Sequence, residues 1–271
     1  MIGFIVPVKP KQFSKNWELD NLLLERTARS ICNQEIDDFK LIIVYTDKPE
    51  INFSHKNIHY IHFSYIMVSH HKLIDWEERK KWHSPIVAER MMDKGRKIAL
   101  GCQKAKELKC TYLMGVDSDD LVSCKLAAFV AENAGENIAG WRINDGYLYE
   151  DNSMIAIKNH KIWFINGSTH IIRADLVDVP DFETDFKFWS YSLFENHAYT
   201  YQRLIHVNNQ TLQTLPFYGV IYLVHKNNYS SIKKFVTGKP IRLLAKKLLK
   251  GKLVGRKMKK EFGLYKLYTS I

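Results

Sequence analysis

The chain has 271 residues, of which 46% are hydrophobic and 25% charged, values typical of globular proteins with a packed core. No apolar run approaches the roughly 18 residues of a membrane-spanning helix, and no signal peptide precedes the first expected strand. The four cysteines lack C-x-x-C spacing, which argues against a disulfide framework and fits a reducing compartment. We therefore expect a cytoplasmic protein.

The formal net charge of +11 is unevenly distributed along the chain. From Lys233 to the end there are thirteen Lys or Arg residues and one acid, Glu261, whereas the rest has 27 basic and 28 acidic residues. A nucleic-acid-binding core would carry its basic residues on the folded body. The nearly neutral body therefore argues against a nucleic-acid partner.

Continuous apolar runs alternate with amphipathic stretches in the first half of the chain. We expect strands at 2–8, 39–47, 57–63 and 111–116, and helices at 17–34 and 86–109. This alternation is typical of a mostly parallel sheet covered by helices on both faces. In such sheets, ligands bind beyond the carboxyl ends of the strands.

The second half is richer in short strands separated by turn residues. Strands are expected at 140–149, 154–159, 161–167 and 169–175, a helix at 189–205, and one or two strands within 215–228. No internal repeat or low-complexity segment interrupts the chain. We expect one α/β domain with a mixed-strand second part.

Three carboxylates in four positions follow the strand expected at 111–116, in the sequence Asp117-Ser118-Asp119-Asp120. Residues i and i+2 of an extended chain point the same way, so Asp117 and Asp119 could bind one cation, with Asp120 aimed elsewhere. Hard divalent ions such as Mg²⁺ and Mn²⁺ take oxygen ligands and often share them with substrate phosphates. The alternative is an acidic turn that caps a helix beginning near 121–130.

Several motifs occur in a characteristic order along the chain: "IVPVKP", "LERTARSICNQ", "LIIVYTD", "DKGRKIALGCQKA", "YLMGVDSDD" and "NGSTHIIR". In this order and spacing, residues 2–230 resemble the family 2 glycosyltransferases of GT-A fold. The resemblance implies a nucleotide-sugar-binding half at 1–122 and an acceptor half at 123–230, followed by a basic tail at 231–271.

The resemblance also implies roles for individual residues. In that family, the paired aspartates hold a Mn²⁺ or Mg²⁺ ion that bridges the diphosphate of the donor, which matches Asp117 and Asp119. The acid that ends the second strand contacts the nucleotide base, which matches Asp47, and a basic helix residue near the phosphates matches Lys97 or Arg96. The donor-binding residues implied in this way are Pro7, Val8, Asp47, Asp93, Lys97, Asp117 and Ser118.

Catalytic and further metal-binding residues are implied in the second half. The general base of the family is an acid at the start of a late helix, which matches Glu195, with Asp185 and Glu183 as alternatives. The stretch "YLVHKNNYS" resembles a late element in which the histidine binds metal or phosphate, so His225 is a candidate metal ligand. A histidine after a strand can equally be an ordinary hydrogen-bonded polar residue. Gly167 is expected to allow a close approach of the backbone.

The basic tail carries leucines at helical spacing, including Leu243, Leu244, Leu248 and Leu249, with lysines between them. Such a helix can lie on an anionic membrane surface, which predicts a peripheral membrane contact through residues 232–262. The alternative is a helix that packs its leucines on the body and exposes its lysines to solvent.

Together these features predict a metal-dependent transferase that moves a sugar from a nucleoside-diphosphate sugar, with UDP as the expected nucleotide. The acceptor would be a glycan or a lipid-linked glycan, and the resemblance implies inversion. One alternative is a nucleotidyltransferase, although "VKPKQFSKNW" lacks the glycine-rich basic loop that such enzymes carry after the first strand. Another is a non-catalytic binding protein that docks on a membrane through its tail.

Overall fold

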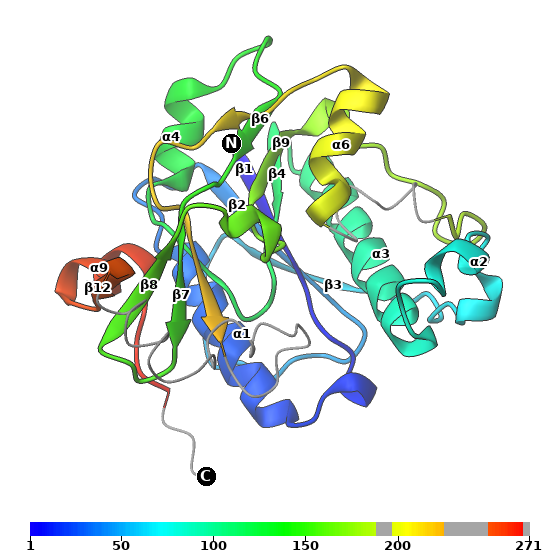
Figure 1. Cartoon of the computed structure of the whole chain (residues 1–271), viewed down its shortest axis with the longest axis horizontal. Helices are drawn as coiled ribbons and strands as arrows, with labels where there is room; N and C mark the ends of the chain where they lie inside the picture. The colour runs from blue at the N-terminus through cyan, green and yellow to red at the C-terminus, as the bar shows by residue number, and fades with distance from the viewer. Residues whose placement is uncertain (188–196, 225–248, 268–271) are drawn as a thin grey trace.

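The computed structural model describes residues 1–187, 197–224 and 249–267 (Figure 1). Two sheets organise these residues, one of seven strands and one of five. All four cysteines are free thiols, in agreement with the sequence.

The seven-stranded sheet forms the centre of the molecule. Its order is β10 (Gln213–Thr214), β6 (Gly140–Arg142), β9 (His170–Arg173), β4 (Tyr112–Gly115), β1 (Ile2–Pro7), β2 (Phe39–Tyr45) and β3 (Ile58–His62). Four of the neighbouring pairs are parallel, and only β9 runs antiparallel to its neighbours β4 and β6. The predicted α/β fold with a mostly parallel central sheet is confirmed.

Two long helices cover opposite faces of this sheet, α1 (Trp17–Cys32) and α3 (Pro85–Glu107). Successive side chains of a strand point to opposite faces of the sheet, and the side chains of β1 are apolar on both faces. Phe4 and Val6 pack in one core with Leu24 of α1, whereas Ile5 packs in another with Ile98 of α3. The continuous apolar run of β1 therefore reflects burial on both faces.

The five-stranded sheet has the order β12 (Gly251–Leu253), β8 (Ile155–Asn159), β7 (Gly146–Glu150), β11 (Val220–Val224) and β5 (Leu121–Val122). Only β7 and β11 are parallel in it. The other α-helices of the described residues are α2 (Trp76–Arg79), α4 (Leu126–Asn133), α6 (His197–Asn208) and α9 (Arg256–Phe262). The second half is mixed, as predicted.

Three local predictions were wrong. The single strand expected at 140–149 is divided between β6 and β7, which belong to different sheets. The strand expected at 161–167 is a short 3₁₀ helix, Ile162–Phe164, because Ile165 and Asn166 both donate their backbone N–H groups to the Ile162 carbonyl. The helix expected near 121–130 begins only at Leu126, since Leu121 and Val122 pair with β11 instead.

The described end of the basic tail is part of the folded body. Strand β12 pairs antiparallel with β8, and α9 buries Met258 and Phe262. After α9, Gly263 adopts φ +59° with its Cα beside Ser30, where a Cβ atom would lie 2.9 Å from the Ser30 Cα. The tail segment 249–267 is therefore part of the folded body, whereas Leu243, Leu244 and Leu248 lie outside the described residues.

An ion pair fixes the first long helix to this C-terminal region. The guanidinium of Arg26 on α1 is fully buried and donates to both carboxylate oxygens of Asp151, at 2.7 and 3.0 Å. It also donates to the carbonyl of Tyr265 at 3.3 Å. Helix α1, the turn between β7 and β8, and the C-terminal segment are thereby held together.

Close packing of α3 on β1 depends on Gly101. A Cβ atom at this position would lie 2.3 Å from Ile5 Cγ2. We expect Gly101→Ala to lower the free energy of unfolding by about 1–2 kcal/mol, because overpacking outweighs the gain of about 1 kcal/mol in helix propensity. Chemical denaturation measures the change. Gly135→Ala is the control, since its Cβ would meet no atom closer than 3.7 Å, and equal stability of the two variants would contradict this account.

Candidate functional site

The acidic segment after β4 forms a tight turn. Ser118 and Asp119 occupy the turn, and the backbone N–H of Asp120 donates to the carbonyl of Asp117 at 3.0 Å. Asp117, Ser118 and Asp119 are partly exposed, whereas Asp120 is fully buried. The expectation of an extended chain here was wrong. Asp120 does point away from the exposed side, as expected.

Asp120 anchors this turn to the segment before β9. Its Oδ2 atom accepts hydrogen bonds from Asn166 Nδ2 at 2.8 Å and from Ser168 Oγ at 2.5 Å. Ser168 Oγ in turn accepts from the Asp117 backbone N–H at 2.8 Å. Burial raises the pKa of Asp120 well above its ordinary value of 3.8, and the carboxylates of Asp119 and Asp117 raise it further.

The acidic turn does not cap a helix. It is followed by β5, and α4 begins later with Lys125 at its N-cap and no capping hydrogen bond from that side chain. The alternative interpretation of the carboxylates as a helix cap is therefore excluded.

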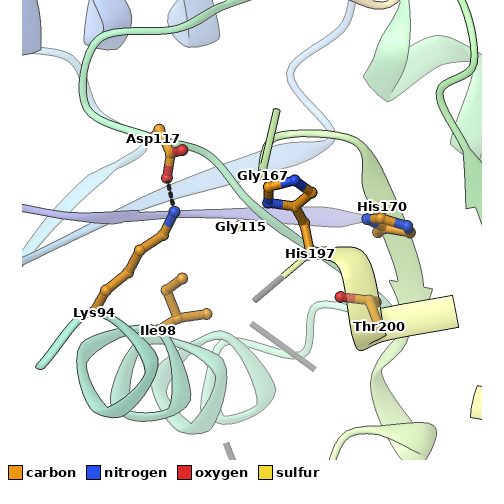
Figure 2. A pocket seen from close by; sticks show the side chains of 8 residues that line it. All are labelled: Lys94, Ile98, Gly115, Asp117, Gly167, His170, His197 and Thr200. Atoms are coloured by element: carbon orange, nitrogen blue, oxygen red, sulfur yellow. Dashed lines mark ion pairs between the residues drawn. The ribbon is translucent and has the colours of Figure 1, made fainter. Parts of the chain in front are cut away.

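Lys94 of α3 forms an ion pair with Asp117 (Figure 2). Burial lowers the pKa of Lys94, but the carboxylates of Asp117, Asp120 and Asp119 together outweigh it, and the pKa is raised. Gly167 leaves room for this pair, since a Cβ there would lie 3.1 Å from Lys94 Nζ and 3.2 Å from Asp117 Oδ2. The close backbone approach predicted for Gly167 is confirmed.

This ion pair forms one wall of a pocket. The lining residues come from α3, the end of β4, the start of β9 and α6: Lys94, Ile98, Gly115, Asp117, Gly167, His170, His197 and Thr200. In Figure 2, the imidazole of His197 lies between the Lys94–Asp117 pair and His170. The His197 Nε2 atom is 3.1 Å from the Phe164 carbonyl. The cavity volume is about 10 Å³, room for roughly one water molecule.

A second polar group lies on the same helix, at the end of β1. The fully buried ammonium of Lys97 donates to the Val8 carbonyl and to Asp93 Oδ2, both at 2.9 Å. Burial lowers the pKa of Lys97, and the carboxylates of Asp93 and Asp47 oppose this effect. Asp47 accepts from the backbone N–H of Lys11 at 2.7 Å. The segment after β1 is thus tied to α3 through Val8 and to the end of β2 through Lys11.

The donor-binding residues predicted from the sequence therefore fall into two groups. One comprises Pro7, Val8, Asp47, Asp93 and Lys97, and the other comprises Asp117 and Ser118. Pro7 and Val8 are buried. Lys97 has no exposed surface, and its role in donor binding remains a prediction. Arg96 points elsewhere, because it donates to the carbonyls of Ile66 and Phe182 and lies over the Phe63 ring.

Of the three candidate general bases, the structure describes Asp185 and Glu183. Asp185 is partly exposed, accepts from the backbone N–H of Lys187 at 3.1 Å and does not line the pocket. Glu183 is exposed. Glu195 and His225 lie outside the described residues, so their catalytic and metal-binding roles remain predictions.

No three His, Cys, Asp or Glu side chains are grouped as metal ligands among the residues that the structure describes. Asp117 and Asp119 nevertheless offer hard oxygen donors at a partly exposed turn. Mg²⁺ is commonly held by one or two carboxylates together with substrate phosphates. The donor set therefore fits a divalent ion shared with a phosphate ligand, with the Lys94 ammonium competing for Asp117.

The sequence analysis missed Lys94 and Asn166. Lys94 lies one helical turn before Lys97, the residue that was proposed in its place, so the spacing of the two lysines was the available signal. No sequence pattern marked Asn166.

Comparison with solved structures gives matches of low TM-score and low sequence identity. Residues 1–349 of S. aureus TarS match with a TM-score of 0.43 and 16% identity, covering 96% of this chain and 68% of that one. The same fragment in complex with UDP-GlcNAc gives a TM-score of 0.44 and 15% identity over 96% and 69% of the two chains. The Francisella tularensis 2-C-methyl-D-erythritol 4-phosphate cytidylyltransferase gives 0.38 and 10%, covering 85% and 93%.

These scores and identities are too low to assign an activity to the chain. No family model and no curated protein matches the sequence. Within the described residues, no helix is both long enough and apolar enough to cross a bilayer.

The Lys97–Asp93 ion pair is expected to act on stability. Lys97→Met leaves the buried Asp93 carboxylate unpaired and should lower the free energy of unfolding by about 3–5 kcal/mol. The double variant Asp93→Leu, Lys97→Met removes both charges and should recover most of the loss. Denaturant unfolding of both proteins tests this. A double variant no more stable than Lys97→Met would contradict the account.

His170 should make stability depend on pH. Burial, assisted by His197 and Arg142, lowers its pKa from 6.5 to about 3. Between pH 6.5 and pH 3, His170 is therefore protonated in the unfolded chain and neutral in the native state. The free energy of unfolding accordingly falls as the pH falls from 6.5 towards 3. The slope is at most about 1.4 kcal/mol per pH unit. Unfolding of wild type and His170→Gln across this range measures it, and parallel curves would disprove it.

Proposed function

We propose that the chain is a glycosyltransferase that moves a sugar from a UDP-sugar to a glycan or lipid-linked acceptor, with inversion and with a divalent metal ion. The main support is the acidic turn at the carboxyl end of β4, where Asp117 and Asp119 are partly exposed and Lys94 lies beside them. This position, beyond the ends of parallel strands, is where α/β sheets bind ligands.

The polar residues around Lys97 and those around the acidic turn suggest where the two parts of a nucleotide-sugar donor would bind. Strand β1 lies between β4 and β2, so the acidic turn and Asp47 stand at the same edge of the sheet, two strands apart. We assign the nucleotide base to the end of β2, near Asp47 and Val8. The diphosphate would then lie towards Lys94 and the acidic turn, at the N-terminal half of α3.

The residues of the chain would stabilise the leaving diphosphate. The raised pKa of Lys94 keeps its ammonium charged, so it can donate charge-assisted hydrogen bonds to phosphate oxygens. Asp117 and Asp119 would hold the metal ion, which supplies Lewis-acid stabilisation of the diphosphate when bound. Asp120, fixed by Asn166 and Ser168, keeps the turn in place.

The acceptor hydroxyl must lose a proton to a general base, which contributes about 10²–10⁴ in rate. We keep Glu195 and Asp185 as the candidates for this base. His197 lines the pocket, but its Nε2 atom faces the Phe164 carbonyl and its pKa is lowered chiefly by burial. We therefore assign His197 to the pocket wall.

Calorimetric titration with UDP, with and without Mn²⁺, tests the proposal on purified wild type and variants. We expect Mn²⁺ to strengthen UDP binding, and Asp119→Ala to abolish this metal effect. Lys94→Met should weaken UDP binding about 10- to 100-fold, because it removes a hydrogen bond to a charged group.

Lys104→Met is the matched control for Lys94→Met. Lys104 lies on the same helix, is similarly exposed and forms an ion pair with Glu107 at 2.9 Å, away from the pocket. It should leave UDP binding unchanged. No heat from UDP in either condition would favour a non-catalytic protein, and a metal effect that persists in Asp119→Ala would refute the assigned ligand. NMR detection of the released or transferred sugar then tests turnover and its stereochemistry.

A further inference from the structure

The described end of the tail carries a dense group of positive charges, here called the basic edge. It comprises the exposed residues of 249–260 that are Lys or Arg: Lys250, Lys252, Arg256, Lys257, Lys259 and Lys260. None of these six side chains forms an ion pair with another residue that the structure describes. The basic edge therefore presents its charge to solvent.

Large apolar side chains are exposed within the same surface. Leu249 is 85% exposed, Leu253 68% and Met154 78%. The pairing of β12 with β8 brings Leu253 beside the chain at Met154, because Leu253 is opposite Ile155 and the Val254 N–H donates to the Met154 carbonyl at 2.9 Å. Leu249 lies two residues before β12. Apolar side chains surrounded by lysines are typical of surfaces that insert shallowly into a bilayer.

The basic edge is fixed to the body. The backbone of α9 is tied down where Asn33 Nδ2 donates to the Lys260 carbonyl at 2.7 Å and the Cys124 N–H donates to the Glu261 carbonyl at 2.9 Å. Glu261, the acid of this helix, turns inward to Lys125 at 3.0 Å and to Ser123. Its negative charge is thus removed from the outer surface, which the lysines dominate.

We propose that the basic edge, with Leu249, Leu253 and Met154, docks the protein on an anionic lipid bilayer. Lysines near an anionic leaflet supply attraction that fades within a Debye length, and the apolar side chains supply contact with the acyl region. A soluble polyanion would use the lysines and leave the leucines exposed to water. In Figure 1, α9, β12 and β8 lie on the left of the view, whereas α3 and α6, which line the pocket, lie on the right.

Co-sedimentation of the full chain with phosphatidylcholine vesicles, with and without phosphatidylglycerol, tests the proposal at about 0.15 M salt. We expect binding only to the anionic vesicles. Lys257→Glu, Lys259→Glu, Lys260→Glu should weaken it by more than about 100-fold. The double variant Leu249→Glu, Leu253→Glu should also weaken it by at least about 10-fold, because it removes two apolar contacts and adds two negative charges.

The matched control for the leucines is Ile66→Glu, Ile74→Glu, at side chains 89% and 64% exposed near α2. It adds the same charge elsewhere and should leave vesicle binding close to wild type. Leu249→Ser, Leu253→Ser, which adds no charge, separates the apolar contribution. Vesicle binding unaffected by the serine variant would overturn the proposal and favour a purely electrostatic contact through the lysines. Equal binding to both vesicle types would also overturn it, because the lysines would then contribute nothing. UDP titration of the same variants should match wild type, so failure here leaves the proposed transferase untouched.

Discussion

The buried carboxyl of Asp120 is the constraint on which the candidate site depends. Its hydrogen bonds from Asn166 and Ser168 join the end of β4 to the segment before β9, which are far apart in sequence. Because Ser168 also accepts from the Asp117 N–H, the same contact sets the position of the exposed aspartate. Gly167, between the two anchors, then leaves the space that the Lys94–Asp117 pair occupies.

Helix α3 connects this turn to the rest of the strand ends. Lys94 and Lys97 lie one helical turn apart, yet one reaches a partly exposed aspartate and the other a buried carbonyl and carboxylate. The division follows from burial, since Lys97 is enclosed at the end of β1. The Lys97 ammonium is held by its hydrogen bonds to Asp93 and to the Val8 carbonyl. It can therefore position the Val8 backbone without contacting a ligand.

The sequence predicted β1, β2 and β4 of the central sheet well because these strands are buried on both faces and their apolar runs are continuous. It also placed Asp47 and Asp117 at strand ends, which follows from where those runs stop. It proposed Lys97 or Arg96 and missed Lys94, because side-chain direction on a helix depends on which faces are covered. The 3₁₀ turn at 162–164 was also beyond reach, since its apolar residues suit a strand equally well and only one of them, Ile162, is buried.

The metal ion of the proposed transferase would also reduce the repulsion between carboxylates and phosphates at the acidic turn. Asp117, Asp119 and Asp120 place three carboxylates in four positions, and Lys94 pairs with the first of them. A diphosphate entering this site would add further negative charge to a partly desolvated region, where repulsion between like charges is stronger than in water. Lys94 alone cannot offset that repulsion, because it already neutralises Asp117. In the proposed transferase, a divalent ion shared between these carboxylates and the phosphate oxygens would reduce that repulsion, which is how Mg²⁺ is commonly held with substrate phosphates.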